Sequence, residues 1–216
     1  NLRIITFIAM KNILLILFIL LITTGCDRRS KDDIIKEKRE EALNLAYGGA
    51  KDKDVWIKNI AKAIKVYEDI IELNPDDVDI DYNDIGSLKT LINPDYQSAI
   101  INYTKSIEHN PKNSDSYYRR GSCKQHIEDY KGAISDLTIA IELDQYNMGQ
   151  YNLRGWSKYR LGMFEEAILD FDTVIDVDAE YHAGASSGYD GRAHTKLMMG
   201  DTTDACIDFL KSKRAT

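Results

Sequence analysis

Residues 98–111 read SAIINYTKSIEHNP, and this stretch sets the frame for the rest of the chain. Ala99 is followed four residues later by Tyr103, and then by Ile107 and Pro111. The same order recurs in KAIKVYEDIIELNP at 62–75, in GAISDLTIAIELD at 132–144 and in EAILDFDTVIDVD at 166–178. The frame alanines stand at positions 63, 99, 133, 167 and 205, and so recur every 34 to 38 residues. A period of this length indicates stacked helical units, each of which needs a neighbour to bury its apolar face.

The first half of each unit carries a second pattern, an aromatic residue followed four positions later by a small one. The pairs are Tyr82 and Gly86, Tyr117 and Gly121, Tyr151 and Gly155, and Tyr189 and Ala193. A small residue lets a partner helix approach closely, while the aromatic ring fills the adjacent gap. The two patterns together predict a pair of packed helices in each unit.

Both patterns resemble those of the tetratricopeptide repeat. The resemblance implies an all-α fold, an α-solenoid of about five tetratricopeptide helical hairpins. We expect this domain over residues 42–216, with repeats near 42–76, 79–112, 114–146, 148–180 and 184–214. The expected helix pairs are 33–50 and 56–73, 79–92 and 95–109, 114–127 and 130–143, 148–161 and 164–177, and 184–199 and 202–214. The three prolines, Pro75, Pro94 and Pro111, all fall between these helices, as a helical array requires.

The N-terminal region reads MKNILLILFILLITTGC from Met10 to Cys26. It has a charged head at Lys11, an apolar run over 13–22 and a small residue, Gly25, at its end. This run is too short to cross a bilayer, which needs about 20 apolar residues. The pattern is typical of a secretory signal peptide, which we predict over residues 1–25 with its start at Met10.

Cys26 follows the signal peptide directly and resembles the lipid-attachment cysteine of bacterial lipoproteins. The resemblance implies that Cys26 is acylated and anchors the protein in the bacterial cell envelope, at the outer membrane or the cell surface. Residues 26–41 are then a charged tether, and SKDD at 30–33 is similar to the acidic export tags of some Bacteroidetes surface lipoproteins. The alternatives are an uncleaved anchor, an ordinary signal cut elsewhere, and a cytosolic repeat protein with a misassigned N-terminus.

Composition and motifs exclude several classes of function. The formal net charge is -7, and an acidic surface repels phosphate backbones, so we expect no nucleic-acid partner. The sequence contains no Gly-rich phosphate loop, GxSxG elbow or HExxH helix. We therefore expect no enzyme activity, no cofactor and no small-molecule substrate.

Two clusters superficially resemble metal sites. Aspartates alternate over 77–81 as in a calcium loop, but Tyr82 stands where an EF-hand needs glycine and Leu88 where it needs glutamate. We interpret them as an acidic loop leading into a helix N-terminus, where negative charge is favourable. Cys123 and His126 form one C-x-x-H pair, which supplies too few ligands for zinc. We therefore predict no metal site.

The resemblance also implies where a ligand binds. In tetratricopeptide arrays, the first helices of successive repeats line a concave groove that accepts an extended or helical peptide. The expected peptide-binding residues are those beside the packing positions in repeats three to five. They are Tyr118, Arg119, Ser122, His126, Asn152, Trp156, Tyr159, Arg160, Asp190 and His194.

Trp156 is the strongest single candidate in this set. Tryptophan, tyrosine and arginine dominate interface hot spots, and Trp156, Tyr159 and Arg160 share a helix face. The alternative is that Trp156 packs against the next helix. The groove is basic and aromatic but lacks the lysines of the carboxylate clamp in chaperone-binding arrays, so we predict an acidic or C-terminal peptide segment as ligand.

These features predict a membrane-anchored scaffold or adaptor that binds a protein or peptide partner. The alternative is a structural subunit of an envelope or glycan-associated complex. Exposed aromatic residues in a row with few charges would favour a sugar ligand. The mixed charge at Arg119, Arg160 and Asp190 favours a protein.

Overall fold

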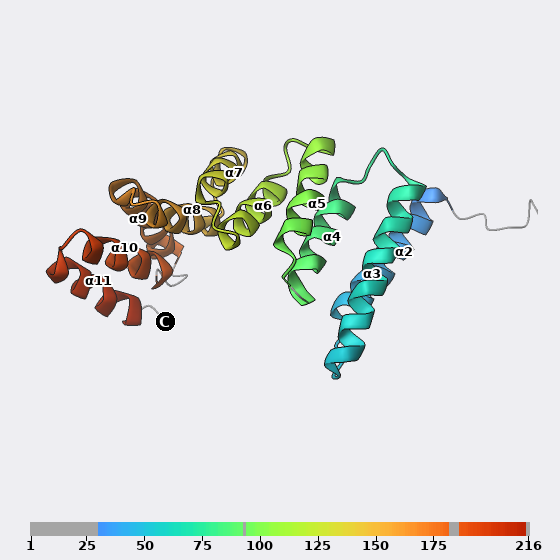
Figure 1. Ribbon diagram of the computed structural model, residues 1–216, viewed down its shortest axis with the longest axis horizontal. Helices are drawn as coiled ribbons and strands as arrows, with labels where there is room; N and C mark the ends of the chain where they lie inside the picture. Colours follow the sequence, from blue (N-terminus) through green and yellow to red (C-terminus); the bar gives the residue numbers. More distant parts are fainter. Residues whose placement is uncertain (1–29, 93, 182–185, 215–216) are drawn as a thin grey trace, which may run out of the picture.

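The structure, a computed structural model, describes residues 30–92, 94–181 and 186–214, and these form ten helices and no strand. The helices are α2 (Lys31–Tyr47), α3 (Lys53–Leu73), α4 (Asp79–Ile92), α5 (Tyr96–His109), α6 (Ser114–His126), α7 (Tyr130–Leu143), α8 (Met148–Arg160), α9 (Phe164–Tyr181), α10 (Ser186–Met198) and α11 (Thr202–Arg214). Consecutive helices pair as five hairpins, here called repeats one to five, and each hairpin contacts the next. Figure 1 shows the hairpins following one another from α2 at one end to α11 at the other. The chain is therefore an α-solenoid, as predicted.

The frame alanines form the seam on which each pair of helices closes. Ala63, Ala99, Ala133 and Ala167 are fully buried, and Ala205 is 1% exposed. The residue four positions after each of the first four alanines is also buried, and these residues are Tyr67, Tyr103, Leu137 and Phe171. The predicted repeat frame is thus confirmed by burial in every hairpin.

The small residues of the second pattern stand where two helices approach most closely. A Cβ added to Gly86 would lie 2.7 Å from Cε1 of Tyr103, and one added to Gly155 would lie 2.8 Å from Cε1 of Phe171. Real Cβ atoms do not approach carbon this closely, since buried side chains are packed at the density of organic crystals. Glycine is therefore required at both positions by the ring that fills the gap.

Short polar side chains mark where the helices begin. The N-cap residues include Asp52, Asp95, Asn113, Asp129 and Asn147, each of which accepts a hydrogen bond from a backbone N–H two or three residues further on. Such caps satisfy donors that have no partner within the helix and are worth about 1 kcal/mol each.

Helices α4, α7 and α11 have the predicted bounds. Helix α9 runs four residues beyond its predicted end, to Tyr181.

The turns inside the last three hairpins share one backbone conformation. Glu128, Gly162 and Gly200 stand at equivalent places and have φ angles of 63°, 74° and 88°. The left-handed region is open to glycine at little cost but is crowded for a residue with a Cβ. Glu128 is therefore the strained member of this series.

The first hairpin begins earlier than predicted. Helix α2 runs from Lys31 to Tyr47, close to the helix predicted over 33–50, so the part of the predicted tether from 31 to 41 is helical. Ser30 and Asp33 form a capping box, in which the Ser30 hydroxyl accepts from the Asp33 N–H and the Asp33 carboxylate accepts from the Ser30 N–H. Ile35 is only 5% exposed and continues the buried stripe of this helix. The SKDD segment thus has a structural role at a helix start.

The predicted signal peptide and Cys26 lie outside the described residues. None of the helices in the described part of the chain combines the length and hydropathy of a bilayer-spanning segment.

The aspartates at 79 and 81 lie in the first turn of α4, as predicted for an acidic helix start. Asp81 is fully buried and accepts two hydrogen bonds from Arg39 of α2, at 2.9 and 2.8 Å.

Candidate peptide-binding groove

An ion-pair triad fixes the first helix of repeat three on its second helix. Arg120 donates from Nε and Nη2 to the two oxygens of Asp136, at 2.8 and 2.7 Å, and Lys124 Nζ lies 2.8 Å from Asp136 Oδ2. Asp136 is 3% exposed, so its charge is held almost out of water. Equivalent triads are formed by Arg154, Lys158 and Asp170 in repeat four and by Arg192, Lys196 and Asp208 in repeat five.

The arginine of each triad also reaches back to the preceding repeat. Nη1 of Arg120 donates to Thr104 Oγ1 at 3.0 Å, and Nη1 of Arg154 donates to Thr138 Oγ1 at 3.2 Å. Arg192 pairs in the same way with a carboxylate, Asp172. The triads therefore tie successive hairpins together as well as the two helices of one hairpin.

The ten predicted peptide-binding residues all lie on first helices. Tyr118, Arg119, Ser122 and His126 belong to α6, Asn152, Trp156, Tyr159 and Arg160 to α8, and Asp190 and His194 to α10. Helix α8 contacts both α6 and α10, so the three helices form one continuous face. The structure gathers seven of the ten residues at two hollows on this face.

The first hollow is enclosed by α4, α5 and α6 and has a volume of about 330 Å³. Its lining includes all four predicted residues of repeat three, together with Thr90, Tyr96, Tyr103 and Cys123. The Arg119 guanidinium lies in this hollow, and its Nε donates to Asp115 Oδ2 at 2.6 Å. Hydroxyl groups and one arginine therefore line a mainly polar recess.

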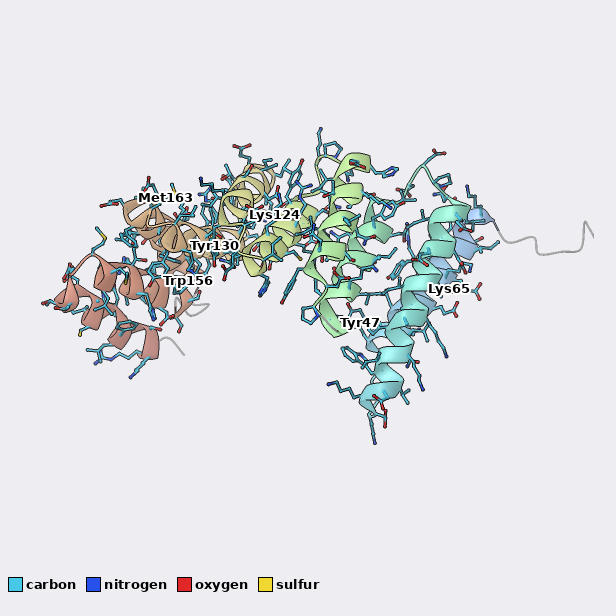
Figure 2. The ribbon with its side chains drawn as sticks, viewed as in Figure 1. Tyr47, Lys65, Lys124, Tyr130, Trp156 and Met163 are labelled. Carbon is cyan, nitrogen blue, oxygen red and sulfur yellow. The ribbon has the colours of Figure 1, made fainter. Side chains whose placement is uncertain are left out.

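The second hollow lies between α6, the start of α7 and α8, and has a volume of about 440 Å³. Trp156, Tyr159 and Arg160 line it, with Tyr130 and Gln125 among the other residues. Figure 2 shows Tyr130 and Trp156 lying near each other where repeats three and four meet. The Arg160 guanidinium lies 5.0 Å from the centre of the Tyr130 ring, in a cation–π contact. Among the described residues, Arg160 has no carboxylate partner.

His126 lines both hollows, so the two hollows are neighbours on this face. Its imidazole is exposed and stacks on Tyr96, with ring centres 4.4 Å apart and planes inclined by 4°. This stacking fixes the orientation of the imidazole ring where the two hollows meet. We refer to the two hollows that share His126 as the groove.

Trp156 has two roles in the structure. Its ring contacts Phe171 of its own hairpin and His194 of the next, with centres 5.5 and 5.6 Å apart. It also meets Tyr159 edge to face at 5.4 Å and remains half-buried at the wall of the second hollow. The packing on Phe171 and His194 agrees with the alternative interpretation, and the binding role of Trp156 stays a prediction.

Three predicted residues line neither hollow. Oδ1 of Asn152 is buried without a hydrogen-bond partner in the described part of the chain. Asp190 and His194 lie further along α10, where the His194 ring packs edge to face on Phe209 at 5.0 Å. His194 contacts the groove residue Trp156, with ring centres 5.6 Å apart.

Sequence reasoning missed the groove residues that second helices contribute. Tyr96 and Tyr130 each stand three residues before a frame alanine, at the first position of α5 and α7. This aromatic position belongs to neither of the two sequence patterns described above. The triads were also not predicted from the sequence. Their arginine and lysine nevertheless recur in a fixed motif, in which Tyr-x-x-Arg is followed by a small residue, two variable residues and Lys, at 117–124, 151–158 and 189–196.

Two side chains that line the first hollow keep their protons at neutral pH. Burial raises the pKa of the Cys123 thiol to about 11, so the thiol is neutral at pH 7 and a poor nucleophile. Burial also raises the pKa of Tyr103 to about 12, which keeps its hydroxyl protonated beside Ser87 at 3.3 Å. In the residues that the structure describes, no group of three or more histidine, cysteine or acidic side chains could hold a metal ion.

The alanine seam, the glycine steps and the stacked hairpins define the tetratricopeptide type of α-solenoid. Residues 102–135 match the sequence profile of the tetratricopeptide repeat. No curated protein matches the sequence. Proteins with this repeat generally act as non-enzymatic scaffolds that bind other proteins.

Solved structures of tetratricopeptide proteins share the fold. MamA 41-end from Desulfovibrio magneticus RS-1 is 18% identical with a TM-score of 0.73, over 86% of this chain and 97% of that one. YrrB, described as a TPR protein with an unusual peptide-binding site, is 19% identical with a TM-score of 0.66, over 87% of this chain and 93% of that one. At these identities the similarity establishes the fold.

Proposed function

We propose that this protein is a membrane-tethered scaffold whose groove binds a segment of a partner protein. The observation that carries the proposal is that two hollows share His126, because they then lie next to each other across α6 and α8. Two neighbouring hollows of this size suit successive side chains of one peptide better than a single compact ligand. The peptide-binding site attributed to the structural neighbour YrrB is consistent with this proposal.

The ligand is an acidic or C-terminal segment. Arg160 is exposed, and the Tyr130 ring at 5.0 Å holds its guanidinium without neutralising it. The positive charge of Arg119 is partly compensated by Asp115, but only the Nε atom of the guanidinium donates to that carboxylate. Arginine forks recognise carboxylates with two parallel hydrogen bonds, and the aromatic walls at Trp156 and Tyr159 can cover the adjoining apolar atoms.

The groove is tested by crosslinking the full chain in its native cells through a photoreactive residue at position 159. Partners captured by the parent protein should be lost from variants Trp156→Ala and Arg160→Ala. The matched control is Tyr146→Ala, because Tyr146 is 80% exposed and lies outside both hollows. Retention of every captured partner by both groove variants, or an equal loss with Tyr146→Ala, would exclude this function.

The ligand chemistry is tested on a peptide derived from the partner that crosslinks. Changing its acidic residues to amides should weaken binding by about tenfold or more, since each charge-assisted hydrogen bond is worth about 1.5–3 kcal/mol. Binding should also weaken with rising salt. Equal affinity for the acidic and amide peptides would show that the arginines do not select the ligand.

The proposal includes a lipid anchor at Cys26, supported by the signal-like segment that precedes it. Several acyl chains on one residue would hold the protein on a membrane, because each buried CH₂ contributes about 0.8 kcal/mol. Metabolic labelling with a fatty acid should mark the native chain and not Cys26→Ser. Labelling of both chains, or of neither, would remove the anchor from the proposal and leave the groove unaffected.

A further inference from the structure

The second helix of each repeat carries a ridge of side chains that receives the next repeat. We define the docking ridge as the residues one, four, five and eight positions after the frame alanine. In repeats two to four these are Ile100, Tyr103, Thr104 and Ile107, Ile134, Leu137, Thr138 and Ile141, and Ile168, Phe171, Asp172 and Ile175. All twelve side chains are buried or half-buried.

The ridge of repeat four shows what covers these side chains. Gly188 of α10 lies so close to the ridge that an added Cβ would stand 2.8 Å from Cγ1 of Ile175. Gly191, one turn later, lies against the Phe171 ring. Asp172, the ridge residue five positions after the frame alanine, pairs with Arg192 of α10. A helix with small residues and one arginine therefore occupies the ridge.

The docking ridge of repeat five has no such cover among the described residues. It consists of Cys206, Phe209, Leu210 and Lys213 on α11, and these four side chains line a hollow of about 280 Å³. Leu210 is 59% exposed, and Cys206 and Lys213 are also exposed. An apolar surface that is buried in each of the preceding three repeats is thus open to solvent here.

The chemistry of this last ridge differs from that of the others at one decisive position. Leu210 replaces the residue that accepts a hydrogen bond from the arginine of the next helix, which is Thr104, Thr138 or Asp172 in the inner repeats. An arginine docked against Leu210 would lose that acceptor, and a buried donor without a partner is costly. The ridge therefore fits an aliphatic side chain at this point.

Helix α11 also differs from the other second helices in the charge of its last turn. Its last turn holds Lys211, Lys213 and Arg214, whereas the last turns of α3, α7 and α9 hold no basic residue and that of α5 holds one histidine. In repeats two and three a short loop joins the end of the second helix to the start of the helix that covers it. The basic turn would therefore face the first turn of a docked helix, where acidic residues are favourable.

We propose that the docking ridge of α11 binds a helix supplied by a partner protein. That helix has acidic residues in its first turn, a small residue that packs on Phe209 and an aliphatic residue that packs on Leu210. The interaction continues the packing between hairpins and uses a surface distinct from the groove, so it stands independently of the function proposed above.

Two stapled helical peptides with the sequence of residues 186–198 serve as probes, since this helix carries the small residues Gly188 and Gly191 that pack on a ridge. Both carry Ser187→Asp, for an acidic first turn, and they differ only in that one keeps Arg192 and the other has Arg192→Leu. Fluorescence anisotropy with the full chain should give at least about tenfold tighter binding of the leucine peptide, because the arginine finds no acceptor on the ridge. Equal binding, or preference for the arginine peptide, would overturn the proposal.

Three variants of the full chain locate the binding surface. Leu210→Glu should weaken binding of the leucine peptide at least about tenfold, while Leu169→Glu, at a 65% exposed leucine outside the ridge, should not. Leu210→Thr should shift the preference back toward the arginine peptide, since it restores the acceptor of the inner repeats. Binding that is unchanged by Leu210→Glu, or lost equally with Leu169→Glu, would place the contact elsewhere.

Light scattering on the full chain tests the competing occupant. A monomer is expected at micromolar concentration. A dimer that Leu210→Glu dissociates and Leu169→Glu preserves would mean that a second copy covers the ridge, and the proposal of a partner protein would be wrong.

Discussion

Removing the shared acceptor of one triad should destabilise the array at that point. Asp170 receives two hydrogen bonds from Arg154 and lies 2.8 Å from Lys158 Nζ, and its side chain is 5% exposed. Asp170→Ala leaves both cations, 16% and 14% exposed, without this carboxylate. Breaking a buried pair costs about 3–5 kcal/mol, and partial access to water favours the lower end. For a chain of this size, about 3 kcal/mol corresponds to a fall in Tm of roughly 6–12 °C.

The assay should separate local from general loss of stability, because repeat arrays unfold in units that depend on their neighbours. Thermal denaturation of the full chain gives the total effect, and hydrogen exchange should show the largest loss of protection in α8 and α9. Asp69→Ala is the matched control, since its pair with Lys38 is 49% and 32% exposed and is worth less than about 1 kcal/mol. The reasoning fails if the two variants are equally stable or if protection in α8 and α9 is unchanged.

Three further substitutions test individual positions. Burial raises the pKa of Asp84, against an opposing hydrogen bond from Tyr67, so charging this group disfavours folding. Asp84→Asn should therefore raise Tm at pH 7, and the gain should vanish as the pH falls through the ordinary aspartate pKa of about 3.9; a pH-independent gain would contradict this. Gly191→Ala should cost about 1–3 kcal/mol in chemical denaturation, because its methyl group overlaps the buried Phe171 ring; a net stabilisation by helix propensity would disprove the overlap. Glu128→Gly should stabilise by up to about 1 kcal/mol by relieving a φ of 63°, and an unchanged Tm would show that the turn is unstrained.

The fold was predictable because its decisive contacts recur at fixed spacings along the chain. Ala99 and Tyr103 are both buried in α5, as the frame requires. Gly86, from the second pattern, lies against that same tyrosine ring. Contacts of this kind depend on size and periodicity, both of which are visible in a single sequence.

The packing of residues 31–41 in the first hairpin, in place of a tether, and the full groove lining were not predictable in the same way. The apolar stripe of α2 consists of Ile35, Ala42 and Ala46 and is diluted by the charged residues between them. The groove brings Tyr96 of α5 against His126 of α6, and this contact depends on how two hairpins lean on one another. Spacing within one helix does not specify that angle, so the residues that second helices contribute escaped the pattern.

The triads and the groove differ in how strictly the repeat governs them, and the reason is physical. A charge in a nearly dry site must find its partner in every repeat, because an unpaired buried ion is costly, and so the Arg-Lys-Asp set recurs unchanged in repeats three to five. The positions 11 residues before the frame alanines reach solvent at least in part and hold Ser122, Trp156 and His194, which share neither size nor charge. Folding places no common demand on these three side chains. Substitution within a triad should therefore alter stability in whichever repeat it falls, whereas the difference between Ser122 and Trp156 is free to decide what each part of the inner face recognises.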